Sequence, residues 1–402
     1  MLIVIPACIY GAMLIPAKFP ATERVESGVT TGDMFKECLR PLFIIWGVCM
    51  LMTAATELGP QKWQESVMRS TAGIPGTLIL VYTSGMMFVL RHFAGPIAHA
   101  ISPVGMMIGS SILSAAGLFL LSTANDATTA VLYATVYGLG VAFFWPTMLG
   151  VTAERFPRGG ALALALMGSI GNLSIAYVLP EMGRIVDVTS VAELKSLDDD
   201  LKTANSGAGD NAALYERVNS RLLGLQLSAD DWKSIYTGRD PIAASINKDG
   251  TALDPTAVTG LFNDAIDSLK EVQKSDPALA ASFLSTPELA EKLEKAPRPE
   301  LVEALSTRSA FNAAKINEAA AANPAAQEFR QRLGEYRLVS SAQATGFSTA
   351  FRTVSILPCI LVVIFTGVFL YDLSRGGYKP EILISRSEEN ELMSGGVPAA
   401  VE

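Results

Sequence analysis

The sequence predicts an all-α membrane protein that carries one large water-soluble insert. Half of its 402 residues are hydrophobic and only 17% are charged, whereas a soluble domain carries roughly 25% charge. The charge is unevenly distributed, because residues 184–345 hold 18 basic and 24 acidic side chains. Most of the remaining chain consists of apolar runs separated by short turns. These observations divide the chain into a membrane part and a polar part.

Six apolar segments have the length needed to cross a bilayer, which takes about 20 helical residues. We expect five transmembrane helices within residues 41–183 and a last one within 346–372. The apolar segments themselves are 41–58, 74–90, 104–122, 128–150, 160–180 and 350–371.

The first sixteen residues are also apolar, but as a helix they would reach only about 24 Å. We therefore interpret residues 1–16 as a partial transmembrane helix, the end of a longer one. Residues 17–40 are expected to form a polar cytoplasmic linker, and residues 373–402 a cytoplasmic tail.

The orientation follows from the basic residues of the short loops, which face the cytoplasm in membrane proteins. On this rule Met1 and the insert at 184–345 are extracytoplasmic, and the protein is an integral multi-pass protein, expected in a bacterial inner membrane. One side holds only Lys62 and Arg69, and the other holds Lys18, Arg24, Lys36, Arg40, Arg91, Arg155, Arg158, Arg375, Lys379 and Arg386.

The insert is predicted to be a small α-helical domain, because Ala, Leu, Glu and Lys dominate it. Helix starts are indicated at Ser228 with Asp231, at Asp254-Pro255 and at Thr286-Pro287. A flexible break is expected near residues 206–209, where the sequence is Ser-Gly-Ala-Gly.

Several functions are disfavoured by composition. The excess of acids in the insert argues against a nucleic-acid partner. The four cysteines show neither paired spacing nor His neighbours, so we expect no metal site. No sequence signature of an enzyme or of a phosphate-binding loop occurs, so we expect no enzymatic activity and no cofactor.

Glu57 is the most informative ionisable residue, because a carboxylate within a span is costly and usually functional. It precedes Gly59-Pro60, where the helix is expected to break. Glu57 is therefore a candidate for proton coupling or solute binding, with a solvated acid at the outer helix end as the alternative. Gln61 and Trp63 are candidates to contact a solute, although Trp63 is equally typical of an interfacial anchor.

Two further polar or aromatic residues lie within spans. Trp145, beside Pro146, is a candidate to line a cavity. Asn172 would hydrogen-bond either a solute or another helix, and the second role is favoured.

Several turns resemble the C-terminal half of the major facilitator superfamily, particularly its fucose:proton and nucleoside:proton symporter branches. Arg91 and Gly95 stand in a segment similar to the turn between helices eight and nine. Glu154-Arg155-Phe156-Pro157-Arg158-Gly159 is similar to the turn before helix eleven. The resemblance covers about residues 1–187 and 345–375, and the insert between helices eleven and twelve departs from it.

The resemblance implies a six-helix C-terminal bundle that transports a small polar solute, a sugar or nucleoside, by alternating access and with protons. It implies conformational roles for Arg91, Gly95, Glu154, Arg155, Arg158 and Gly159, with Gly95 allowing close approach of two helix ends.

Such transporters are built from two bundles, so a missing N-terminal half or a partner chain is expected, with homodimerisation less favoured. The rival interpretation is a membrane-anchored sensor or interaction protein that uses the insert.

Overall fold

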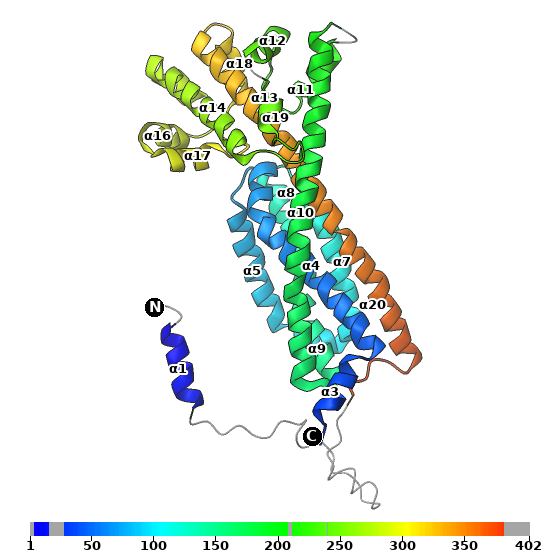
Figure 1. Cartoon of the computed structure of the whole chain (residues 1–402). Helices are drawn as coiled ribbons and strands as arrows, with labels where there is room; N and C mark the ends of the chain where they lie inside the picture. Colours follow the sequence, from blue (N-terminus) through cyan, green and yellow to red (C-terminus); the bar gives the residue numbers. More distant parts are fainter. Residues whose placement is uncertain (1–3, 16–27, 208–210, 239, 382–402) are drawn as a thin grey trace, which may run out of the picture.

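The computed structural model describes residues 4–15, 28–207, 211–238 and 240–381. These residues are overwhelmingly helical and contain no strand, only two isolated β-bridges, between Ile246 and Leu253 and between Leu284 and Phe311. The all-α class is therefore confirmed. Figure 1 shows a helical bundle with a second group of helices at one end.

Five helical stretches of the described chain are long and apolar enough to cross a membrane, so the chain is a multi-pass membrane protein by length and composition. A sixth span was expected at 74–90, but its helix α5 (Gly76–His92) has 17 residues and reaches only about 26 Å. The five stretches are α4 (Pro41–Thr71), α7 (Pro103–Leu121), α8 (Ala127–Val141) with α9 (Phe144–Arg155), η1 (Pro157–Gly159) with α10 (Gly160–Asn205), and α19 (Pro324–Val354) with α20 (Ile356–Ser374).

These helices enclose one hydrophobic core. Trp46, Met50, Phe144 and Phe365 are each almost fully buried in it. On the same helix as Trp46, Ile44 is exposed. A helix that is apolar on both its inner and outer faces is typical of a membrane span, because lipid replaces water outside.

Two interruptions differ from expectation. The break predicted at Gly59-Pro60 is wrong, because α4 runs through Pro60 as one helix. The span expected at 128–150 is instead divided at Ala142 and Phe143, where α8 ends and α9 begins.

The expected linker also contains structure. Within it, α3 (Thr31–Cys38) begins with a capping box in which Thr30 and Asp33 bond each other's backbone N–H. Residues 17–27 of this linker lie outside the described chain. Two other short helices are α1 (Val4–Leu14) and α6 (Ala94–Ile101).

The insert is built on two helices that leave the bundle without interruption. α10 continues from the bundle into the insert, and α19 returns along it to α20 (Figure 1). Between them lie α11 (Asn211–Asn219), α12 (Ala229–Gly238), α13 (Pro241–Ser245), α14 (Pro255–Ser275), α15 (Pro277–Ser282), α16 (Pro287–Lys295), α17 (Arg298–Leu305) and α18 (Ala313–Ala320).

The insert has its own hydrophobic core, which extends from Val191 to Ala342 and includes the fully buried Trp232. The three predicted helix starts are confirmed, since α12, α14 and α16 begin directly after Ser228, Asp254 and Thr286. The break expected near residues 206–209 follows the end of α10 at Asn205, and its last two residues lie outside the described chain.

Candidate functional site

Two prolines leave helix carbonyls without their normal donors, and side chains of neighbouring helices bond to both. Pro60 has no N–H, so the carbonyl of Thr56, four residues earlier, loses its helical bond. The Tyr137 hydroxyl of α8 donates to this carbonyl and to that of Glu57, at 3.1 Å each. This cross-helix donor explains why α4 continues through Pro60, because a carbonyl buried in the bundle needs a partner.

Pro146 in α9 acts in the same way on Ala142. The Ala142 carbonyl loses its donor, and the Nε–H of Arg91 on α5 donates to it at 2.9 Å. Arg91, expected in a cytoplasmic turn, therefore reaches the interruption between α8 and α9.

Arg91 also forms an ion pair with Glu57, with 3.5 Å between its Nη2 and the carboxylate Oε1. Glu57 is only 5% exposed, which contradicts the alternative of a solvated acid at a helix end. Its second oxygen, Oε2, is buried and has no hydrogen-bond partner among the described residues. A buried carboxylate with an unused acceptor is costly unless another group or a proton satisfies it.

Glu57 and Arg91 line a cavity between α4 and α5. Gln61 is its other polar residue from α4, and its amide nitrogen lies 4.0 Å from the Met87 sulfur. The cavity is further lined by Ser84, Phe88 and His92. The structure therefore brings together three of the predicted residues, Glu57, Gln61 and Arg91.

The other solute candidates lie elsewhere. Trp63 packs against Phe347 of α19, with 5.7 Å between ring centroids. The Trp145 ring lies against Gly171 of α10. Asn172 is exposed, and its amide donates to the Gly168 carbonyl of its own helix at 2.9 Å, so the link to another helix that we favoured is wrong.

The turn residues gather at the end of the bundle opposite the insert. Arg155 is buried and forms an ion pair with Asp372 at the end of α20. The carboxylate of Glu154 accepts a hydrogen bond from Tyr378, and its carbonyl accepts one from the Glu381 N–H at 2.8 Å. Burial and the bond to Glu154 raise the pKa of Tyr378, so the phenol remains a neutral donor.

The remaining turn residues have fewer contacts. Gly159 is buried, whereas Arg158 is exposed. Gly95 lies in α6 with no atom near the position of an added Cβ, so the close helix approach expected there is wrong. The side chain of His92 is exposed and contacts Phe88 edge-on.

Three residues of these networks were not singled out from the sequence as site residues. Nothing local to Tyr137 indicates its bonds to two carbonyls that are 81 and 80 residues away. Asp372 lies at the end of α20 and Tyr378 follows that helix, and no local pattern indicates that they bond to the Glu154-Arg155 turn. Among the described residues, no cluster of three or more His, Cys, Asp or Glu could hold a metal ion.

No protein-family model matches the chain, and neither curated proteins nor solved structures gave a significant match. The fold and the site define a multi-pass helical membrane protein with a buried carboxylate, Glu57, that pairs with Arg91 at a cavity. Its function is therefore argued from the residues themselves.

Proposed function

We propose that the chain functions in the secondary active transport of a small polar solute, coupled to protons through Glu57. The observation that carries the proposal is the buried Glu57 carboxylate, which pairs with Arg91 at a cavity and keeps one oxygen unbonded. Ionisable groups at such positions in membrane proteins commonly form proton and solute pathways.

The geometry supports a coupling step. A proton on Glu57 removes the negative charge that holds the Arg91 guanidinium, and the bond from Arg91 to the Ala142 carbonyl remains. Arg91 can then direct its free N–H groups to a solute oxygen, beside Gln61. Arg91 also donates to the Ala142 carbonyl, where α8 ends and α9 begins. A change in the ion pair of Arg91 would therefore be transmitted to a point at which the helix is already divided.

Solute choice is part of the proposal. Gln61 and Arg91 offer amide and guanidinium groups suited to hydroxyl and carbonyl oxygens. A sugar or a nucleoside, the classes that the resemblance to the symporter branches implies, presents such oxygens. Movement of the cavity between the two membrane faces would be alternating access.

The test is uptake of radiolabelled L-fucose and uridine into vesicles, at outside pH values between 5.5 and 8. The chain is assayed alone and together with the polypeptide encoded upstream, because the resemblance implies a second bundle. We expect Glu57→Gln to lower uptake at least tenfold and to abolish its pH dependence at unchanged abundance, since an amide cannot exchange a proton.

Glu181→Gln is the matched control, because Glu181 is an exposed acid of α10 that pairs only with Arg184 among the described residues. Uptake by Glu57→Gln with the pH dependence of the unsubstituted protein would remove Glu57 from the mechanism.

A second candidate function is a membrane-anchored sensor, and the continuity of α10 and α19 favours it. Both helices connect the bundle to the insert with no intervening loop, so a ligand of the insert would act directly on the spans. Joining Asp187 to Ser341 through a short Gly/Ser linker separates the candidates. A transporter keeps uptake in this variant, whereas a sensor shows no uptake with or without the insert.

A further inference from the structure

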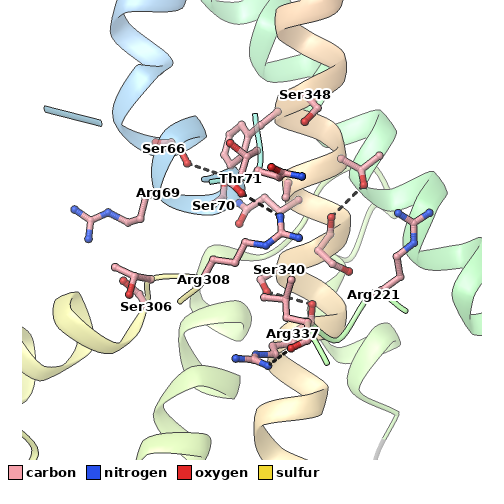
Figure 2. Close-up of a pocket in the computed structure, with 18 of the residues that line it drawn as sticks. Ser66, Arg69, Ser70, Thr71, Arg221, Ser306, Arg308, Arg337, Ser340 and Ser348 are labelled. Carbon is pink, nitrogen blue, oxygen red and sulfur yellow. Dashed lines mark hydrogen bonds between the residues drawn. The ribbon is translucent and has the colours of Figure 1, made fainter. Parts of the chain in front are cut away.

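A pocket lies where the bundle meets the insert, and its walls are basic. It is formed by the outer end of α4, the α7–α8 turn, the α17–α18 segment and α19 (Figure 2). Its volume is about 620 Å³. Thirteen Ser and Thr residues line it, no Asp or Glu does, and its five cations are Arg69, Arg221, Arg308, Arg337 and Arg352.

Two of these cations have carboxylate partners just outside the pocket. Arg69 pairs with Glu65 at 2.5 Å and approaches Glu303 at 3.7 Å. Arg221 pairs with Glu193 at 2.7 Å. These acids balance Arg69 and Arg221, so the excess of positive charge comes from the other three arginines.

Neither Arg308 nor Arg337 forms an ion pair with a carboxylate of the described residues, and their hydrogen bonds go to neutral carbonyl oxygens. Arg308 extends across the pocket and its Nη1 donates to the Thr71 carbonyl, at the end of α4, at 3.0 Å (Figure 2). The Nη1 of Arg337, which is 4% exposed, donates to the carbonyls of Leu222 and Leu223 at 3.0 and 3.2 Å. Burial lowers the pKa of Arg308, as expected for a charge held away from water without a counter-ion.

Arg352 is the third cation without an acid. It lies over the Phe119 ring, 5.2 Å from the centroid, and no carboxylate of the described chain forms an ion pair with it. It lines the pocket close to the start of the apolar segment 350–371.

A purely structural role explains part of this arrangement. Arg308 caps the carbonyl end of α4, and Arg337 caps a loop. Capping occupies one nitrogen of each guanidinium, which carries five N–H groups. It leaves the charges unbalanced, and buried charge without a partner is unfavourable.

We propose that this pocket binds an oxyanion of the phosphate type, carried by a small soluble molecule or by a lipid headgroup. Guanidinium groups bind phosphate oxygens with paired hydrogen bonds, and Ser and Thr hydroxyls donate to the remaining oxygens. A pocket of this volume falls within the range of small-molecule sites and exceeds the size of bare phosphate. The site is independent of transport through Glu57.

The experiment uses the full chain purified in a neutral detergent, with glycerol 3-phosphate as the soluble probe. Thermal unfolding and calorimetric titration measure its binding. Nanodiscs of phosphatidylcholine, with and without phosphatidylglycerol, present the same phosphate chemistry as a lipid. Competition between the soluble probe and phosphatidylglycerol then identifies the source.

Gln343→Glu is the most direct variant, because Gln343 lines the pocket and the substitution adds a charge with almost no change of shape. We expect it to weaken binding of the probe at least tenfold and to raise the melting temperature of the anion-free protein. Arg352→Gln, at an exposed position, should weaken binding similarly. Gln273→Glu on α14, outside this pocket, is the matched control.

Saturable binding of glycerol 3-phosphate that is lost in Gln343→Glu supports a soluble ligand. Selective retention of phosphatidylglycerol that is lost in the same variant supports a lipid headgroup. Absence of both, or equal binding by Gln343→Glu and Gln273→Glu, would overturn the proposal.

Discussion

A single side-chain hydroxyl or backbone N–H decides whether a buried backbone carbonyl of this bundle has a hydrogen-bond donor. Tyr137 donates to two carbonyls, of which that of Thr56 is free only because Pro60 has no N–H. Because the role of the Tyr137 hydroxyl depends on Pro60, substituting the two residues singly and together tests this interpretation.

Tyr137→Phe should lower the free energy of unfolding by about 1 kcal/mol, because it leaves a buried carbonyl unbonded. In a Pro60→Ala background the restored N–H bonds to Thr56, and the cost of Tyr137→Phe should be at least halved. Unfolding of the four proteins in mixed detergent micelles measures this cycle. Equal costs in both backgrounds would show that the Tyr137 hydroxyl contributes independently of the carbonyl that Pro60 leaves free.

Asp231 in the insert is a second residue whose role depends on its hydrogen bonds. It is 2% exposed and accepts bonds from Ser228, Gln327, Gln331 and Arg330. Burial raises the pKa of Asp231, but the bonds from Gln331, Ser228 and Gln327 outweigh it and lower the pKa from 3.8 to about 2.

Because the folded pKa lies below the unfolded one, Asp231 stabilises the insert fully above about pH 4. This contribution, roughly 2 kcal/mol, should be lost as the pH falls from 4 to 2. Hydrogen exchange of the α12 amides at pH 5 and pH 2.5 measures it. Asp231→Asn should lose most of the pH dependence, and Asp199→Asn, at an exposed position, should keep it.

The sequence predicted residues with different success. The helix starts at Ser228, Asp254 and Thr286 depend on neighbours within a few positions, so local patterns were sufficient to predict them. The roles of Trp63 and Asn172 depend on which face of a helix packs against which neighbour. The sequence of a single chain does not show how its helices pack. The partner of Glu57 is 34 residues away and was not predicted.

At the scale of elements, the unbroken course of α4 and the division of α8 from α9 are the main departures from expectation. α4 contains Pro60, and α9 contains Pro146. In α4 the compensating donor allows the helix to continue, whereas before Pro146 the helix divides although Arg91 bonds to the free carbonyl. The rule that proline ends a helix applies to an isolated segment and cannot include a donor from another helix.

The contact of α10 with α19 depends on Gly346. An added Cβ at this position would lie 2.6 Å from the Val186 carbonyl oxygen, so the two helices approach closely where the bundle becomes the insert.

Gly346→Ala should therefore destabilise the protein by about 1–3 kcal/mol, as overpacking does. Gly367→Ala in α20 is the control, because nothing lies within 4 Å of its added Cβ. There the substitution should be neutral or stabilise by up to about 1 kcal/mol, through helix propensity. Melting temperatures in detergent compare the two, and equal effects would mean that α10 and α19 do not rely on this contact.

At the scale of the whole molecule, the short connections at the end of the bundle opposite the insert carry basic residues. Arg40, Arg155 and Lys379 lie near the end opposite the insert, where Arg40 pairs with Glu37 and Glu381. The insert covers the other end (Figure 1). Basic residues near short connections face the cytoplasm, so the insert is expected outside.

Cysteine labelling tests this orientation in a background that lacks the exposed Cys8 and Cys359. Lys248→Cys, on the surface of the insert, should react with an impermeant thiol reagent added to intact cells. Lys379→Cys should react only after the membrane is opened. Both positions are exposed, so the reverse pattern would invert the orientation.

Only Ser355 separates α19 from α20. This direct connection also affects the order in which the chain folds and enters the membrane during its synthesis. α10 leaves the ribosome well before α19, so the insert core cannot close until more than a hundred further residues have been synthesised. α20 packs against α7 and α19 packs against α10. Insertion of the last span and closure of the insert therefore become one late event in biogenesis, and a defect in either should expose both to quality control.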